Sequence, residues 1–320
     1  MLALARVTLL LTLSSCHRGG GVNADGGLGA DAAVGTDGGA TTDSGAADDA
    51  AGPAPSRVYG VTVDDISNLA AVVASLSALP HRATARIVFD EGQPPSQYSS
   101  AAQQIHAVSD VMGEILDSQF VANVSVAEYQ KRTQDYLAAL ASEVDIWEVG
   151  NEINGNWVDT TAGGVTDVVA KMSGAFDLVG AAGGRTALTL YACSDADGKH
   201  DMLTWAKANV PARMRTGLDW VLVSFYEGDC GVAAPDWPTV FHELREVFPT
   251  AALGFGEVGA VDHSGQRITD VNVAGPYLRK YYGLIIPEPG YVGGHFWWYF
   301  AEDMVPSSKP MFAVLADAIH

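Results

Sequence analysis

Short β-rich segments alternate with helical segments eight times between residues 58 and 320, and this alternation constrains the fold more than any other feature of the chain. Strands separated by helices pair in parallel, because each crossover returns the chain to the same edge of the sheet. The length of this part of the chain is close to the roughly 250 residues of a (β/α)8 barrel. We therefore expect an α/β fold, the (β/α)8 TIM barrel, with a doubly wound open sheet as the alternative. The predicted strands are residues 58–63, 85–89, 111–116, 144–149, 187–191, 220–225, 252–256 and 293–299.

Helical segments are expected between these strands, because their apolar residues recur at the spacing of one helix face. In the segment 126–141, Tyr129, Leu137 and Leu140 can share an inward face while Gln130 and Lys131 face water. The clearest helix candidates are residues 66–78, 126–141, 165–179, 238–248 and 271–282.

The first sixteen residues have the features of an export signal. Arg6 precedes an apolar run at residues 7–13, which small residues follow. The run ends in Leu-Ser-Ser-Cys16, which resembles the lipobox of bacterial lipoproteins, whose cysteine becomes the lipidated first residue. The resemblance implies that the protein is exported and anchored through Cys16 to a bacterial membrane, facing the periplasm or the cell surface. An ordinary secretory signal with a chance cysteine is the alternative.

The segment 17–57 has the composition of a flexible linker. Its 41 residues include eleven Gly, ten Ala and six Asp, and no aromatic residue. Such a segment cannot bury enough apolar surface to offset the entropy lost on ordering, so we expect it to be disordered. The expected organisation is a lipoprotein signal peptide at 1–16, a linker at 17–57 and a catalytic barrel at 58–320.

Charge and cysteine content exclude several classes of protein. The chain carries 38 acidic residues against 18 Lys and Arg, whereas a nucleic-acid binder needs a basic surface to neutralise phosphates. Three cysteines are too few for a disulfide scaffold or a four-cysteine zinc module. No apolar run reaches the roughly 18 to 20 residues of a spanning helix. We expect a monomer that binds no nucleic acid and contacts the membrane only through its lipid anchor.

Two of the predicted strands run into a glutamate. Residues 146–152 (Ile-Trp-Glu-Val-Gly-Asn-Glu) leave the fourth strand, and residues 253–257 (Leu-Gly-Phe-Gly-Glu) end the seventh. In a (β/α)8 barrel the loops after the strands build the active site, so polar residues at these ends are typical of catalysis. Glu152 and Glu257 are remote in the chain, and half a turn of the barrel would bring them to opposite sides of one site.

These strand ends resemble those of the large clan of retaining glycoside hydrolases with a (β/α)8 fold, often called clan A. In that clan an Asn-Glu pair after strand four carries the acid/base, and a glutamate at the end of strand seven is the nucleophile. The resemblance implies that Glu152 is the acid/base, that Asn151 supports it, and that Glu257 is the nucleophile. It covers 58–320 in layout, with specific matches confined to strand ends, and identifies no individual family.

Glycoside hydrolysis needs two carboxyl groups, because the leaving oxygen must receive a proton while the developing oxocarbenium ion meets a carboxylate. When the two groups are about 5 to 5.5 Å apart, the second attacks the sugar directly and configuration is retained. Glu152 would then be protonated at rest and Glu257 ionised, so their surroundings must separate the two pKa values.

The same resemblance implies three further site residues. Arg86 in the second strand would contact the nucleophile, Tyr226 after the sixth would hydrogen-bond to it, and Trp298 in the eighth would form the floor under the cleaved sugar. Trp157 is a candidate wall for the leaving group, because sugars stack their C–H faces on aromatic rings. The alternatives are a core position for each aromatic residue and the barrel edge for Arg86.

Other polar residues are expected on the same rim. Asp90, Asp117 and His295 lie at or near predicted strand ends, where they could bind sugar hydroxyls. Cys193 and Cys230 follow neighbouring strands, so we expect a disulfide between them in an exported protein, with two free thiols as the alternative.

Motifs for other chemistries carry no function here. Residues 254–259 match the Gly-x-Gly-x-x-Gly pattern of dinucleotide-binding proteins, but that motif requires a helix directly after it, and loop residues follow here. The sequence contains no Gly-x-Ser-x-Gly elbow or phosphate-binding loop, and its eight histidines lack the usual metal-ligand spacings. We therefore expect no cofactor and no metal.

The sequence favours a retaining glycoside hydrolase that acts on a polysaccharide or oligosaccharide. Two alternatives stay open. One is a non-catalytic, carbohydrate-binding barrel at the cell surface, and the other is a hydrolase that uses a metal without a recognised ligand pattern.

Overall fold

The structure is a computed structural model that describes residues 57–193, 198–230 and 233–320. The predicted signal peptide, its lipidation site Cys16 and the linker up to residue 56 lie outside the described residues.

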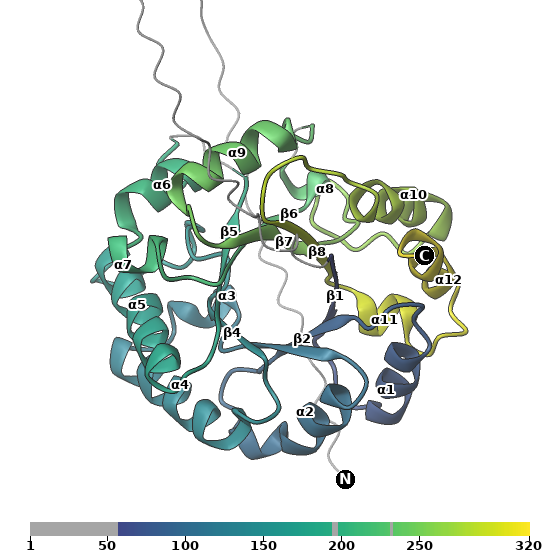
Figure 1. The fold of residues 1–320 in the computed structure, drawn as a ribbon, viewed down its shortest axis with the longest axis horizontal. Coiled ribbons are helices and arrows are strands. Elements are labelled where there is room, and N and C mark those ends of the chain that lie inside the picture. The colour runs from purple at the N-terminus through teal and green to yellow at the C-terminus, as the bar shows by residue number, and fades with distance from the viewer. Residues whose placement is uncertain (1–56, 194–197, 231–232) are drawn as a thin grey trace, which may run out of the picture. The chain divides into compact units, whose positions relative to one another are not determined.

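Eight parallel strands form a closed barrel, in which each strand pairs with the next in the chain and β8 pairs with β1 (Figure 1). Closure confirms the (β/α)8 barrel and excludes the open sheet, which would keep two unpaired edges. The strands are β1 (Val58–Val63), β2 (Thr84–Val88), β3 (Asp110–Glu114), β4 (Ile146–Gly150), β5 (Thr186–Tyr191), β6 (Trp220–Phe225), β7 (Ala252–Val258) and β8 (Tyr291–Trp297).

Helices surround the barrel on its outer side (Figure 1). None of the helices in the described parts of the chain is both long and apolar enough to cross a membrane. They are α1 (Leu69–Ser77), α2 (Ser99–His106), α3 (Ser118–Val121), α4 (Val126–Leu140), α5 (Val165–Ala181), α6 (Met202–Asn209), α7 (Ala212–Arg215), α8 (Glu227–Cys230), α9 (Trp237–Val247), α10 (Val271–Tyr282), α11 (Phe300–Met304) and α12 (Pro310–Ala318), with a 3-10 helix η1 (Pro95–Gln97).

Helix α4 forms where its apolar spacing predicts it. Ser125 and Glu128 make a reciprocal capping box, which supplies partners for backbone N–H groups at the start of the helix. Tyr129 and Leu140 are buried against the barrel, while Lys131 on the opposite face is exposed. Local capping and the amphipathic pattern therefore both favour a helix over these residues.

The last strand ends earlier than predicted. The sequence favoured a strand through residue 299, but β8 ends at Trp297, and Trp298 lies in the connection to α11. The backbone N–H of Trp298 still donates to the carbonyl of Val258 at the end of β7, 2.9 Å away. Trp298 is thus held at the rim of the barrel, where the strands end.

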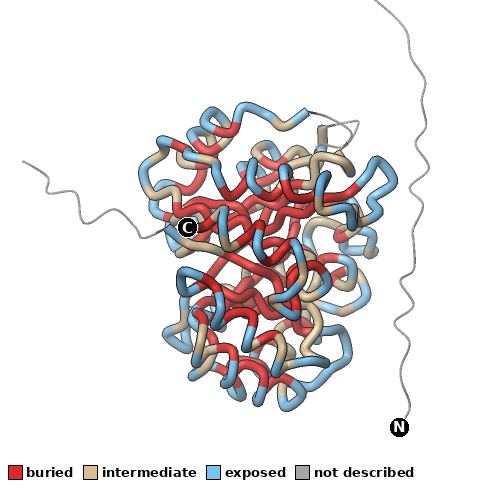
Figure 2. The backbone as a smooth tube through the Cα atoms, turned by 90° about the vertical axis from the view of Figure 1, so that its right-hand side faces the viewer, coloured by how far each residue is buried: buried red, intermediate tan, exposed pale blue. Residues whose placement is uncertain are grey.

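Buried residues fill both the space between barrel and helices and the barrel interior, as the red segments in Figure 2 indicate. One apolar cluster consists mainly of strand residues facing helix residues. A second, separate cluster draws its buried residues from strands alone, so it packs inside the barrel. Its members are Met112, Ile146, Ala187, Trp220, Leu222 and Phe296.

A hollow of about 980 Å³ opens at the end of the barrel where the strands begin. Asp145 and Asp219 line it, and each accepts a backbone N–H at the start of a neighbouring strand, from Val111 at 2.7 Å and Thr186 at 2.8 Å. These carboxylates therefore serve the stability of the barrel, because they supply partners for backbone N–H groups at the starts of strands. The candidate functional site is at the opposite end.

Candidate active site

Glu257 and Glu152 both lie at the end of the barrel where the strands finish. Glu257 is the sixth residue of the seven-residue strand β7, and Glu152 follows β4 with a left-handed φ of 41°. Their exposed fractions are 6% and 9%. Burial raises the pKa of Glu152 well above its usual range, and the negative charge of Glu257 raises it further. The two carboxyl groups therefore interact across the barrel interior.

Glu257 is held by a cation and a hydroxyl group. Nη1 of Arg86 donates to its Oε2 at 2.8 Å, and the hydroxyl of Tyr226 donates to its Oε1 at 2.5 Å. Burial raises the pKa of Glu257, while Arg86 and the Tyr226 hydrogen bond oppose that rise. Both contacts favour the ionised carboxylate.

Glu152 is held by two serine hydroxyls. Oγ of Ser118, the first residue of α3, donates to Oε2 at 3.1 Å, and Oγ of Ser224 in β6 donates to Oε1 at 2.5 Å. No cation is paired with this carboxyl group among the described residues. The pKa of Glu152 is consequently raised more than that of Glu257.

Asn151 directs a donor into the same space. Its Oδ1 accepts the backbone N–H of Ser118 at 3.0 Å, which fixes the side-chain amide. Its Nδ2 is buried and has no hydrogen-bond partner among the described residues. A buried donor of this kind is satisfied when a ligand oxygen binds to it.

Aromatic side chains flank both carboxyl groups. The indole N–H of Trp157 donates to Oγ of Ser118 at 3.1 Å, and its ring meets that of Tyr191 edge-on at 5.1 Å. On the other side, the guanidinium of Arg86 lies 5.5 Å from the ring centre of Trp298. Trp157 and Trp298 therefore lie beside the residues that contact the two glutamates.

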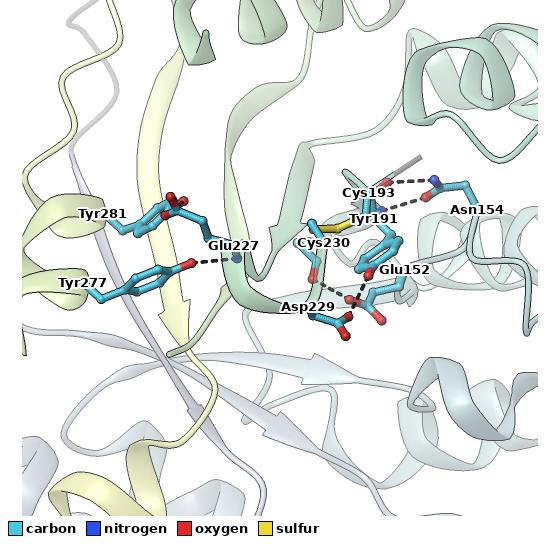
Figure 3. Close-up of a disulfide and its surroundings, with 10 residues drawn as sticks. Glu152, Asn154, Tyr191, Cys193, Glu227, Asp229, Cys230, Tyr277 and Tyr281 are labelled. Atoms are coloured by element: carbon cyan, nitrogen blue, oxygen red, sulfur yellow. Dashed lines mark hydrogen bonds between the residues drawn. A yellow bond between two sulfur atoms is a disulfide. The ribbon is translucent and has the colours of Figure 1, made fainter. Parts of the chain in front are cut away.

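The disulfide predicted between Cys193 and Cys230 is present, with their Cα atoms 5.4 Å apart. It joins the end of β5 to the short helix α8, and Figure 3 shows it beside Tyr191 and Glu152. The hydroxyl of Tyr191 donates to Asp229 of α8 at 2.9 Å. The bridge therefore joins the segment after Tyr191 to the helix that carries Asp229.

The expectation that His295 binds substrate is wrong. Its side chain is fully buried, stacks 5.2 Å from the ring of Phe255, and its Nε2 is 3.1 Å from the Tyr291 hydroxyl. Phe255 packs in turn against Trp237 of α9, so His295 lies in the layer between barrel and helices. The reason is a backbone φ of 70°, which breaks the alternation of strand faces.

The two predicted aspartates differ in position. Asp117 is the N-cap of α3, where it accepts the Gln119 backbone N–H at 2.8 Å, and its charge also raises the pKa of Glu152. Asp90 is exposed after β2. Asp117 thus lies at the site, whereas Asp90 is exposed.

Sequence reasoning missed four polar residues of the site. Glu114 and Glu148 point inward and contact Arg86, and Ser118 and Ser224 hold Glu152. The inward set of alternating strand positions could have found Glu148 and Ser224, which are single polar residues in apolar runs. Among the described residues, no group of three His, Cys, Asp or Glu could hold a metal ion.

The sequence matches no family model and no curated protein. The fold, however, is similar to solved structures of glycoside hydrolases. A family 5 glycoside hydrolase from Prevotella bryantii aligns with a TM-score of 0.54 and 15% identity, over 78% of this chain and 84% of that one.

Two further similar structures contain bound oligosaccharide. Saccharomyces cerevisiae Gas2p in complex with laminaripentaose aligns with a TM-score of 0.53 and 13% identity, over 82% of this chain and 64% of Gas2p. This chain thus spans less than two thirds of that protein. A family 128 endo-β-1,3-glucanase from Amycolatopsis mediterranei, also with laminaripentaose, aligns with a TM-score of 0.50 and 13% identity, over 82% of this chain and 100% of that one.

Proposed function

We propose that this protein is a glycoside hydrolase that cleaves the O-glycosidic bonds of a polysaccharide or oligosaccharide with retention of configuration. The observation that carries the proposal is the pairing of Glu152 and Glu257, in which Glu152 has the more strongly raised pKa. Carboxyl groups whose surroundings separate their pKa values divide the acid and base roles between them. The glycoside hydrolases of similar fold support the same activity.

In the first step, the carboxylate of Glu257 attacks the anomeric carbon while Glu152 gives its proton to the departing glycosidic oxygen. The C–O bond to the leaving group breaks, and a covalent glycosyl-enzyme forms on Glu257. Arg86 and Tyr226 keep Glu257 ionised and aimed before this step. Ser118 and Ser224 orient Glu152 towards the leaving oxygen.

In the second step, Glu152 acts as a base. Having lost its proton, it takes one from a water molecule, whose oxygen attacks the anomeric carbon and releases Glu257. The negative charge on Glu257 disappears when it bonds to the sugar, which removes one cause of the raised pKa of Glu152. Glu152 is therefore a stronger acid in the intermediate, as its role as base in this step requires.

The walls of the site suit a carbohydrate. The free N–H of the Asn151 amide can donate to a sugar hydroxyl, and the rings of Trp157, Tyr191 and Trp298 offer apolar faces to C–H groups. Gas2p and the family 128 glucanase were both solved with laminaripentaose. A β-1,3-glucan is accordingly the first substrate to test.

The decisive experiment is an activity screen on laminarin, mixed-linkage β-glucan, xyloglucan, mannan, xylan and galactan, with the wild type beside E152Q and E257Q. Each variant keeps the shape of the side chain, while E152Q removes the acid/base and E257Q removes the nucleophile, so a loss of at least about 10² to 10⁴ in kcat is expected. Glu246→Gln on the exposed side of α9 is the matched control. Full activity of either site variant would contradict the proposal.

The stereochemistry of the reaction is measured by NMR, from the anomeric configuration of the product that forms first. Retention is expected, whereas an inverted product would contradict a glycosyl-enzyme on Glu257. Binding of oligosaccharide without turnover would favour a carbohydrate-binding barrel instead. Loss of activity in a chelator would favour a metal-dependent hydrolase.

We also propose that the protein is exported and anchored through Cys16, with its barrel on the outer side of the membrane that holds it. The support is the apolar run that ends in Leu-Ser-Ser-Cys16. Cells grown with labelled palmitate should label the wild type and not Cys16→Ala. Label that survives the substitution would contradict the anchor.

A further inference from the structure

The barrel interior next to Glu257 holds two carboxyl groups that the proposed mechanism does not use. Glu114 and Glu148 come from the neighbouring strands β3 and β4, and both are fully buried. Nε of Arg86 lies 2.7 Å from Oε2 of Glu148, and its Nη2 lies 3.2 Å from Oε2 of Glu114. With Glu257, three glutamates contact one guanidinium group.

The donors of Arg86 are divided between these carboxyl groups. One edge of the guanidinium, Nε and Nη2, faces Glu148 at 2.7 and 3.2 Å, while Nη1 faces Glu257 at 2.8 Å. A two-point contact fixes the plane of a guanidinium, which a single contact does not. Glu148 is itself held by the hydroxyl of Thr189, which donates to Oε1. The orientation of Nη1 towards Glu257 therefore depends on Glu148.

Glu114 differs from Glu148 in its hydrogen bonds, because Glu148 accepts from Arg86 and Thr189. Burial raises the pKa of Glu114 well above its usual range, and neither of its oxygens makes a hydrogen bond of good geometry among the described residues. Burial without such bonds favours the protonated form of a carboxyl group. The positive charge of Arg86 is thus shared mainly between Glu148 and Glu257.

We propose that Glu148 is a positioning residue of the active site, which acts on Glu257 through Arg86 by fixing the guanidinium and taking part of its charge. The proposal rests on the proposed function, in which Glu257 is the nucleophile. An arginine paired with Glu257 alone would hold that carboxylate more tightly. Sharing the arginine leaves Glu257 oriented, ionised and more basic, and a more basic carboxylate attacks carbon more readily.

Other titratable groups surround Arg86 and Glu257, so the test must change one carboxyl group at a time. They come from the ends of five strands and the segments that follow. Besides Glu148, they are Glu114, Asp117, Glu152, Tyr191, Tyr226 and Tyr299.

The experiment follows the side-chain carboxyl carbon of Glu257 by NMR in the full chain labelled with ¹³C-glutamate, with E257Q to assign its signal. E148Q keeps the side-chain shape and one acceptor but removes the negative charge. The negative charge of Glu148 disfavours the ionised form of Glu257. Its removal in E148Q is therefore expected to lower the titration midpoint of Glu257 by about one pH unit. E114Q is the matched control at equal burial on the same arginine, and it should leave the midpoint in place because it replaces a neutral group by a neutral amide.

An unmoved midpoint in E148Q, or an equal shift in E114Q, would overturn the proposal. If E148Q does not fold, E148D serves instead: it retracts the carboxylate from Arg86 and should shift the midpoint in the same direction by less. In turnover, E148Q should lower kcat about tenfold with little change in KM. The titration needs no substrate, so a wild type inactive on every glycan would refute the proposed function while the NMR result still decides the role of Glu148.

Discussion

Nη1 of Arg86 lies 2.8 Å from Oε2 of Glu257, although the two residues are 171 positions apart in the chain. Strands β2 and β7 carry them into the same barrel interior, where the Arg86 side chain is fully buried. Burying an ion pair costs desolvation of both charges, and hydrophobic residues of similar volume would often be as stable. A charged interior at this end therefore indicates a site kept for chemistry at some cost to stability.

Tyr226→Phe removes the hydroxyl that donates to Oε1 of Glu257. That hydrogen bond lowers the pKa of Glu257, so its loss raises the pKa. The acid limb of kcat/KM, which reports ionisation of Glu257, should move to higher pH, and kcat/KM should fall by about 10- to 100-fold at its optimum. A pH profile measures both. Tyr59→Phe, at the opposite end of the barrel in β1, is the control, and an acid limb that stays in place in Tyr226→Phe would contradict the role of Tyr226.

Ser224→Ala removes the hydroxyl 2.5 Å from Oε1 of Glu152. The bond lowers the pKa of Glu152, so without it the proton is held to higher pH. The alkaline limb of kcat/KM should therefore move upwards, whereas the acid limb stays. Ser75→Ala, another buried serine whose hydroxyl has no hydrogen-bond partner among the described residues, should move neither limb. A downward shift in Ser224→Ala would mean that the serine stabilises the protonated acid instead.

The barrel and its two central glutamates could be predicted because both depend on short-range patterns. Eight strand-like segments separated by amphipathic helices leave few folds to choose from, and Glu152 and Glu257 end two of those strands. Ser118 is different, because it reaches Glu152 only through the four-residue helix α3 that follows β3. The geometry of such a loop depends on tertiary contacts that one sequence does not display.

His295 shows where the pattern itself misleads. His295 was expected near the site because it lies in the predicted eighth strand, close to the rim of the barrel. Gly293, Gly294 and His295 instead have φ values of 87°, 85° and 70°. Three consecutive residues with positive φ interrupt the regular alternation of faces within β8, and the histidine packs in the layer between barrel and helices.

The Cys193–Cys230 disulfide should contribute to stability as well as hold the segment after β5 against α8. It closes a loop with a sequence separation of 37, and in the chain-entropy model such a bridge stabilises the fold by about 4 kcal/mol. The double variant Cys193→Ala/Cys230→Ala should lose roughly that much free energy of unfolding in urea denaturation. Because the bridge also joins the loops that carry Tyr191 and Asp229, KM should rise.

A reducing agent provides the control for this pair. It should lower the stability of the wild type and leave the double variant unchanged. Alkylation of both thiols in the untreated wild type, with unchanged mobility on a non-reducing gel, would contradict the bridge.

His295→Asn tests whether the buried histidine makes the fold sensitive to acid. Burial lowers the pKa of His295 to about 3, against about 6.5 in an unfolded chain. Between these values the unfolded chain binds a proton that the folded protein excludes, so the histidine's contribution to stability is lost as the pH falls from 6.5 towards 3.

Asparagine tolerates the left-handed backbone and does not titrate, although it loses the stacking on Phe255. The wild type should therefore be the more stable protein at pH 7, and its advantage should shrink by up to about 1.4 kcal/mol per pH unit on acidification. Urea denaturation of both proteins at pH 7, 6, 5 and 4 measures this difference, and a difference that stays constant over that range would show that His295 takes up its proton without unfolding the barrel.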